Sequence, residues 1–508
     1  MSTGRTTPRT THRPATVAAL LLALFVAAME MTVVSTAMPT VVAELGGALH
    51  YGWVFTAYML TSTVTVPIYG KLADLHGRKP VMLVAMALFL VGSMASGQAR
   101  TMGQLIAFRA VQGVGAGGMQ PMALTIVGDI FKIEERAKMQ GLFGAVWGIA
   151  GLVGPLLGGV IVASLSWRWV FYVNVPFGLV SASVITFSLV ETIEKRKHGL
   201  DIAGALLLAA AVIALLLGAD GHSPWVLLPA SAVLTAAFLF VEKRAKEPLV
   251  PLQLFAQRVL ATSSALSALA GGAMVGLVTF VPLYAQGVLG ATPTEAGTTI
   301  ATMAVTWPIA SAISGRLIAR VGFRNLVRIG FAFVAVAALW LGAAMSGGAS
   351  ASKLRIITAL FGIGMGLANT PLVIAVQSSV TFSQRGVATA STMFFRNIGG
   401  TVAVGVMGVV LARALLAGAA REAGGAELVA RILGPDRRNV EPSVLASISG
   451  DLALGVGAVM WIVAGLALGA AAVAWLFPKV ASTSAAAATP AAPERRPPET
   501  ERIAKDPP

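Results

Sequence analysis

A single carboxylic acid interrupts the first long apolar run of the chain. Glu30 lies within residues 17–39, a run that holds no other charged side chain. About 20 apolar residues suffice to cross a bilayer, and a carboxylate in such a segment is costly unless it faces a bundle interior or a water-filled cavity. The position of Glu30 in this run therefore predicts that it binds and releases a proton inside a membrane protein.

Arg109 is the expected partner of Glu30. It lies in a second apolar run, 102–128, that crosses the membrane in the opposite direction to the run over 16–38. At 1.5 Å per residue, Glu30 lies about 21 Å from one face and Arg109 about 10 Å from the other. In a hydrocarbon core of about 30 Å these depths agree within a helical turn. We expect the two side chains to pair, and a purely structural ion pair is the alternative to one that takes part in proton coupling.

Apolar runs recur to the end of the chain and are the elements that must hold this pair. Of the 508 residues, 56% are hydrophobic and 12% are charged, whereas soluble domains carry about 25% charged residues. We expect an all-α membrane protein with about fourteen transmembrane helices, since runs this long are helices and not barrel strands. The expected spans are 16–38, 53–71, 80–98, 102–128, 139–163, 169–190, 200–218, 224–241, 260–287, 294–317, 325–345, 354–378, 386–412 and 452–477.

Basic residues indicate the orientation of these spans. Lys and Arg gather in every second loop, in clusters such as 71–79, 132–138 and 195–197, and are sparse in the short loops between. The one large outer loop, 413–451, holds several arginines, but acidic residues bring its net charge near zero, and it has room for a short amphipathic helix. Because cytoplasmic loops carry the excess of positive charge, we expect both termini in the cytoplasm of a multi-pass plasma-membrane protein. The net charge of +15 then reflects topology and not nucleic-acid binding. A secretory signal peptide would also begin with basic residues, but here the first run is long and many more follow.

Two glycine patterns repeat along the chain. Gly70-Lys-Leu recurs as Gly315-Arg-Leu, and Gly113-x-Gly-x-Gly recurs as Gly362-x-Gly-x-Gly, with offsets of 245 and 249. Chance matching of Gly-rich helices is the alternative to a true repeat, and repeated halves around a site are a transporter plan. The expected organisation is a cytoplasmic tail over 1–13, a six-helix bundle over 14–194, two inserted linker helices over 195–245, a second six-helix bundle over 246–478 with an outer loop over 413–451, and a disordered tail over 479–508.

The connection between the second and third spans has the composition of a tight, charged turn. Its residues of interest are Gly70, Asp74, Gly77, Arg78 and Lys79. Glycine permits the turn, and the aspartate can accept hydrogen bonds from a helix N-terminus or pair with the arginine. The stretch resembles the loop motif of the major facilitator superfamily, which implies a latch between two bundles on the cytoplasmic side. Ala319 takes the place of the aspartate in the second copy, so the latch should be asymmetric.

Two further stretches resemble motifs of the same superfamily. The run from Leu105 to Gly115 is similar to its helix-4 motif, whose arginine is implicated in proton coupling; the repeat position of Arg109 is Thr358. The fifth span resembles the motif that marks antiporters, through Gly151, Gly154, Pro155, Gly158 and Gly159. Glycines four apart make a flat face for a neighbouring helix, and the proline favours a kink. Generic helix packing is the alternative explanation for these glycines.

Three stretches narrow the resemblance to the fourteen-helix drug:proton antiporters. They are 30–39, 167–178 and 395–400, and the resemblance covers residues 14 to 478. Glu30 stands where that family usually has Asp, and Ser35 where it has Asn. The resemblance implies a monomeric, proton-driven exporter of small amphipathic drugs or toxic compounds that needs no cofactor. An exporter dedicated to one metabolite, lipid or self-made antibiotic is the alternative.

Other classes of function find little support. No phosphate-binding loop of the ATP-binding type is visible, and we find no converging nucleophile, base or metal groups of an enzyme. Cysteine is absent and the five histidines show no metal-ligand spacing, so we expect no metal site. A sensor or structural membrane protein remains a further alternative. Candidates for an adaptable substrate cavity are Met31, Thr32, Gln112, Trp147, Trp307, Phe395 and Arg396, although each could serve packing, and Arg396 could bind an anionic group or a structural partner.

Overall fold

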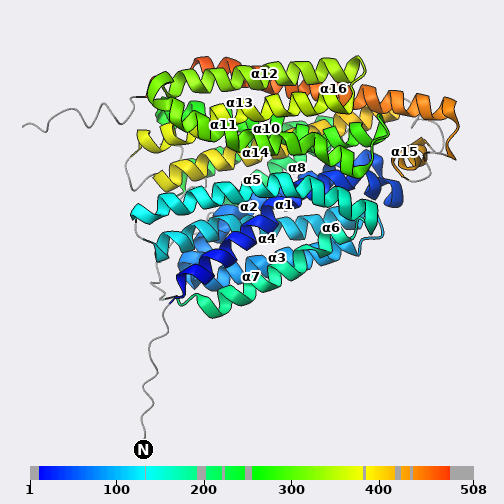
Figure 1. Ribbon diagram of the computed structural model, residues 1–508. Helices are drawn as coiled ribbons and strands as arrows, with labels where there is room; N and C mark the ends of the chain where they lie inside the picture. Colours follow the sequence, from blue (N-terminus) through cyan, green and yellow to red (C-terminus); the bar gives the residue numbers. More distant parts are fainter. Residues whose placement is uncertain are drawn as a thin grey trace, which may run out of the picture.

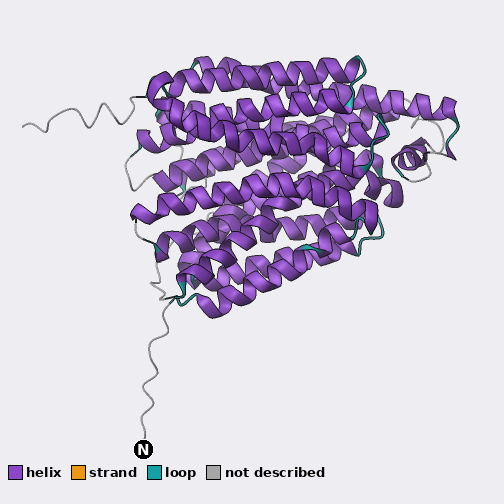
Figure 2. Cartoon of the chain, in the orientation of Figure 1, coloured by secondary structure: helices purple, strands orange, loops and turns teal. Residues whose placement is uncertain are grey.

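The computed structural model describes residues 11–131, 133–191, 202–219, 223–245, 255–380, 385–417, 425–434, 437 and 439–480. Within these residues the regular structure is helical (Figure 1, Figure 2). Eleven helices among them are long and apolar enough to cross a membrane, and Ala203–Gly218 is a shorter apolar helix. The expected all-α membrane fold is confirmed at this level. Most of the two expected tails, 1–13 and 479–508, lies outside the described residues, which begin at 11 and end at 480.

The helices follow the apolar runs and mostly extend beyond them. The first group is α1 (Arg13–Leu45), η1 (Ala48–His50), α2 (Tyr51–His76), α3 (Arg78–Gly97), α4 (Met102–Ile130), α5 (Ile133–Ser164), α6 (Trp169–Tyr172) and α7 (Asn174–Ser188). A hairpin of α8 (Ile202–Ala219) and α9 (Pro224–Arg244) follows. The second group is α10 (Arg258–Gly287), α11 (Pro293–Val321), α12 (Phe323–Ser346), α13 (Ala351–Ser379), α14 (Arg385–Ala417), α15 (Gly425–Leu433) and α16 (Pro442–Trp475).

The loop expected over 413–451 is shorter in the structure. Helix α14 continues to Ala417 and α16 already begins at Pro442. Hydropathy ends the first of these helices too early and begins the second too late, because the helix ends carry polar residues, such as Arg413 and Ser443, that do not belong to the apolar runs. The stretch between them contains α15, whose Val429 and Ile432 are buried. The short amphipathic helix for which the sequence left room is therefore present.

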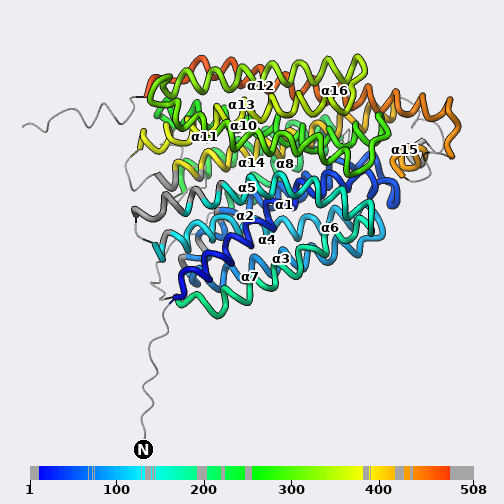
Figure 3. The backbone as a smooth tube through the Cα atoms, in the orientation of Figure 1, coloured from blue at the N-terminus to red at the C-terminus, as the bar shows by residue number. Residues whose placement is uncertain are grey.

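The two groups of helices lie side by side (Figure 1, Figure 3). They meet along two seams, where α5 packs on α11 and α2 packs on α14. The α8–α9 hairpin lies over the second seam: Leu216 of α8 contacts Gly405 of α14 and packs with Leu60 and Val64 of α2. Small residues permit the close approach, since Gly52 of α2 faces the backbone of α14.

The groups are joined at the end of the molecule that holds α15, here called the α15 end (Figure 1). Nε2 of Gln286 donates to the carbonyl of Thr36 over 2.9 Å, and the hydroxyl of Tyr51 donates to the carbonyl of Thr279 over 2.9 Å. Helix α15 itself packs on α1 as well as on α16. Arg437 fixes the end of α10 by donating to the carbonyl of Gly287 over 2.7 Å. Contacts near the α15 end therefore hold the two groups together.

Candidate functional site

Glu30 and Arg109 meet in the interior of the first group. Glu30 is 1% exposed and Arg109 is 0% exposed. Nη1 of Arg109 donates both to Oε1 of Glu30 and, over 2.7 Å, to Oε1 of Gln112. The other carboxylate oxygen of Glu30 accepts a hydrogen bond from Nδ2 of Asn174 over 2.5 Å. The structure thus brings the two predicted residues into direct contact, and adds Gln112 and Asn174 to a cluster that we call the Glu30 cluster.

Arg109 is only partly satisfied by hydrogen bonds. Its guanidinium carbon lies 4.1 Å from the ring centroid of Tyr58 and 5.9 Å from that of Phe171, distances at which a cation is attracted to a ring face. Nε and Nη2 of Arg109 find no hydrogen-bond partner among the described residues, and neither do Nε2 of Gln112 or Oδ1 of Asn174. A buried group without a partner is costly. Four polar atoms of the Glu30 cluster therefore have unused hydrogen-bonding capacity.

Asn174 reaches Glu30 from the first turn of α7. The helix is interrupted between α6 and α7, because Pro176 has no N–H for the carbonyl of Tyr172 four residues earlier. Nδ2 of Asn174 also lies 3.0 Å from Oγ of Ser93, which in turn donates to the carbonyl of Phe171 over 2.9 Å. Helices α3, α6 and α7 thus orient the amide that binds the carboxylate.

The glycines of α5 face two neighbours. Gly154 and Gly158 lie against α1, where a side chain would collide with the hydroxyls of Thr32 and Thr36. Gly151 and Gly159 lie against α11, where the nearest residues are Ala304 and Thr294. The carbonyl of Pro155 lies against Gly297 of α11. The predicted flat face exists, and it joins the helix of Glu30 to the second group of helices.

The turn between α2 and α3 is held within the first group. Gly77 has φ of +97°, a conformation that favours glycine. The backbone N–H groups of Arg78 and Lys79 donate to the carboxylate of Glu191 over 2.5 and 3.0 Å, and Nε of Arg78 lies 3.1 Å from Oδ2 of Asp129. Nζ of Lys79 donates to backbone carbonyls at the end of α7. These contacts close the turn on α4 and α7.

Two other members of the expected latch, Gly70 and Asp74, lie further back along α2. Gly70 lies in α2, and a Cβ atom there would meet no atom within 4 Å. Asp74 lies one turn further along α2, and its side chain is outside the described part of the structure.

The expected cavity residues occupy different surroundings. Gln112 belongs to the Glu30 cluster, and Thr32 packs against α5. Trp147 of α5 is 43% exposed, whereas Met31 and Trp307 are half-buried. Phe395 stacks edge-to-face on Phe255 and on Phe394, with ring centroids 5.3 and 5.7 Å away. Arg396 is half-buried beside Gly271 of α10.

The family model described as Major Facilitator Superfamily matches residues 20–404. The chain belongs to this superfamily. Multidrug transporter protein MdtP of Bacillus subtilis (strain 168) is 38% identical over 401 residues, which cover 77% of this chain and 74% of that protein. Multidrug resistance protein 3 of the same organism is 37% identical over 404 residues, with coverage of 77% and 78%. A solved bacterial homolog of the human lysosomal transporter Spinster, inward-facing and occupied, shares the fold with a TM-score of 0.66 at 15% identity, covering 92% of this chain and 97% of that one.

Membership in the superfamily makes the chain a multi-pass membrane transporter and not an enzyme. Sequence reasoning missed three residues of this transporter that touch the charged groups. Tyr58 carries no sequence signal, because only the packing of α2 on α4 places its ring over Arg109. Glu191 follows α7 in the chain and reaches the α2–α3 turn only in the folded protein. Asn174 lies within the aromatic stretch that resembled the family, which was the available clue.

Proposed function

We propose that this transporter exports small amphipathic compounds in exchange for protons. The contact between Glu30 and Arg109 carries the proposal, because a buried carboxylate in a transporter is the simplest group that can bind and release the coupling ion. The relatives named as multidrug transporters support export of drug-like compounds. The proton gradient is then the energy source and no cofactor is required.

The coupling follows from the partners of Glu30. As a carboxylate it accepts from Arg109 and from Asn174; once protonated it loses the ionic attraction that holds α1 to α4. Arg109 is left with its hydrogen bond to Gln112 and with the faces of Tyr58 and Phe171. A proton therefore changes the relative stability of two arrangements of the helices, and only such a differential affinity can couple proton entry to substrate exit.

The full membrane topology is part of the proposal. The eleven apolar spans and the short helix Ala203–Gly218, together with α2 and α4, which have 26 and 29 residues, make fourteen crossings. The basic loops then place both termini in the cytoplasm and the α15 end outside. We further propose two six-helix bundles over 14–194 and 246–478, linked by the hairpin within 195–245, in a monomer of the plasma membrane.

The substrate path is proposed to follow the contact region of the two groups. Met31, Trp147, Trp307 and Phe395 supply polarizable and aromatic surface, which suits compounds of varied shape. Arg396 supplies a cation for substrates with an anionic group. A transporter dedicated to one metabolite would instead accept one compound from a chemically varied panel.

Reconstituted liposomes test the proposal. We expect an imposed proton gradient to drive accumulation of a fluorescent amphipathic cation by the wild type, with protons moving the opposite way. Glu30→Gln should abolish this gradient-driven transport while the protein stays folded. Glu44→Gln is the matched control, since Glu44 lies on the same helix but is half exposed and pairs with Arg168. Gradient-driven transport by Glu30→Gln at the wild-type rate would overturn the assignment.

A further inference from the structure

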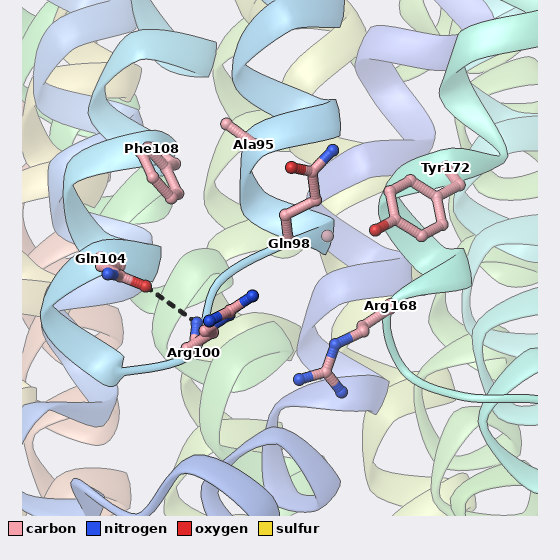
Figure 4. A pocket seen from close by; sticks show the side chains of 8 residues that line it. Ala95, Gln98, Arg100, Gln104, Phe108, Arg168 and Tyr172 are labelled. Carbon is pink, nitrogen blue, oxygen red and sulfur yellow. Dashed lines mark hydrogen bonds between the residues drawn. The ribbon is translucent and has the colours of Figure 1, made fainter.

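A polar cavity lies outside the Glu30 cluster, at the α15 end of α3 and α4. Its volume is about 520 Å³, and the residues that give it its character are Gln98, Arg100, Gln104, Phe108, Arg168 and Tyr172. They come from the end of α3, the start of α4 and the segment that opens α6. Figure 4 shows the side chains of Arg100 and Arg168 on the same side of this space, with the hydroxyl of Tyr172 pointing into it and the amide of Gln98 turned away from the two guanidinium groups.

The charges of this cavity are unbalanced. Nη1 of Arg168 donates to the carboxylate of Glu44, and the guanidinium carbon lies 4.4 Å from the ring centroid of Trp167. The described hydrogen bond of Arg100 comes from its backbone N–H, which donates to the side chain of Gln104 over 2.9 Å. In the contacts described for these residues, the Glu44 carboxylate pairs with Arg168, and no carboxylate pairs with the guanidinium of Arg100. The cavity therefore suits an anion, for which arginine offers paired N–H donors.

The same cavity borders a face that is suited to hydrocarbon. On the neighbouring turns, Val91 and Met94 of α3 are 59% and 43% exposed, and Val111 of α4 is 40% exposed. In a membrane transporter such exposed apolar side chains contact lipid chains. Trp169 on α6 is 51% exposed, and tryptophan is enriched at the level of the lipid headgroups. The cavity thus lies where a headgroup would sit above its own acyl chains.

We propose that this cavity binds the phosphate group of an anionic phospholipid. Arg100 and Arg168 hold the phosphate oxygens, the hydroxyl of Tyr172 donates a further hydrogen bond, and the acyl chains lie along Val91 and Val111. The site does not depend on proton coupling; the proposed orientation assigns it to the outer leaflet. Because Arg168 also holds Glu44 at the end of α1, the lipid contacts the residues that anchor the helix of Glu30.

Lipid binding to the purified full-length protein tests this site without any transport measurement. Native mass spectrometry gives apparent affinities for phosphatidylglycerol and for phosphatidylcholine with identical acyl chains. We expect phosphatidylglycerol to bind the wild type more tightly, and Arg100→Gln to weaken it by about tenfold, the loss of one charge-assisted hydrogen-bond pair. Gln98→Glu, which places a negative charge at the same cavity, should weaken it as well. Phosphatidylcholine binding should be unchanged in both variants.

Lys353→Gln is the matched control, because Lys353 is an exposed cation at the corresponding end of α13. An equal loss in Lys353→Gln and Arg100→Gln would overturn the proposal in favour of general surface charge. Equal affinity of the wild type for both lipids would overturn it too. Displacement of phosphatidylglycerol by inorganic phosphate at the same concentration would assign the site to a free anion and not to a lipid.

Discussion

The helix pairs α2–α4 and α11–α13 pack with the same contacts. In the first pair, the carbonyl of Tyr58 and the hydroxyl of Thr61 lie against Gly113. In the second, the carbonyl of Met303 and the hydroxyl of Thr306 lie against Gly362. The threonine hydroxyls donate to the carbonyls of Ala110 and Ala359 over 2.8 and 2.9 Å. The sequence repeat is therefore also a repeat of packing.

Other local features repeat in the same register. Thr101 caps α4 and Ser350 caps α13, each through its side-chain oxygen. Gly77 and Gly322 end α2 and α11 with φ of +97° and +80°. These shared caps and turns give the two groups one common scaffold.

The two pairs differ where the charges lie. Arg109 of α4 corresponds to Thr358 of α13, whose hydroxyl donates to the carbonyl of Thr299 over 2.6 Å and lies 2.7 Å from the hydroxyl of Thr302. The carbonyl of Met29 faces Gly154 and that of Ala268 faces Gly399, so Leu269 takes the position of Glu30. The scaffold is shared, but the ionisable pair of the first half is replaced at these two positions of the second half by Thr358 and Leu269.

Alanine substitution of the equivalent residues Arg109 and Thr358 should give the largest difference in stability and transport between the two halves. Arg109→Ala leaves Glu30 buried without its counter-ion, which should cost ~3–5 kcal/mol of stability and abolish gradient-driven transport. Thr358→Ala removes hydrogen bonds between neutral groups and should cost ~1 kcal/mol while transport continues. Thermal unfolding and liposome transport measure both variants. Equal losses of transport would show that the asymmetry has no functional meaning.

A charge placed in the second half should be poorly tolerated. Thr358→Arg buries a guanidinium beside Thr299 and Thr302. We expect the free energy of unfolding to fall by ~3 kcal/mol or more, because the described contacts of Thr358 include no carboxylate that could serve as a counter-ion. The double variant with Leu269→Glu should recover part of this loss if the two positions match Arg109 and Glu30. Unfolding temperatures of the single and double variants give the coupling. If Leu269→Glu restores none of the stability lost in Thr358→Arg, the proposed equivalence of Leu269 and Glu30 is wrong.

The success of the sequence predictions depended on how local each feature was. The depths of Glu30 and Arg109 follow from counting residues along two helices, and the glycines of α5 follow from spacing on one helix. The contact of Asn174 with Glu30 depends on the break before α7, and the contact of Tyr58 with Arg109 depends on the rotation of α2 about its axis. Residue spacing in the sequence predicts neither contact. Glu191 lies 113 residues beyond Arg78 in the turn that it binds, so only the tertiary fold reveals this contact.

The two turn glycines should differ in a graded way. Both have positive φ, so alanine is strained at each position by ~1–2 kcal/mol. At Gly77 a Cβ atom would also lie 2.8 Å from the carboxylate of Glu191, whereas at Gly322 it would meet no atom within 4 Å. We expect Gly77→Ala to be the more destabilising, measured by thermal unfolding. A larger effect of Gly322→Ala would contradict the described contacts of the first turn.

The smallest expected effect concerns how the following helices begin. The N-caps Gly77 of α3 and Gly322 of α12 both lack a side-chain cap. Glu191 nevertheless accepts from the first two N–H groups of α3, and the hydrogen bonds described for α12 include no such remote carboxylate. A negative charge near a helix N-terminus stabilises it by ~0.3–1 kcal/mol. Glu191→Gln keeps one acceptor oxygen and removes the charge, so its cost should fall in that range and shrink in high salt. Glu295→Gln, in the capping box of α11, gives the reference for a charge lost at an exposed cap. If the cost of Glu191→Gln exceeds this reference several-fold and does not respond to salt, Glu191 does more than cap α3, and the asymmetry of the halves extends to their turns.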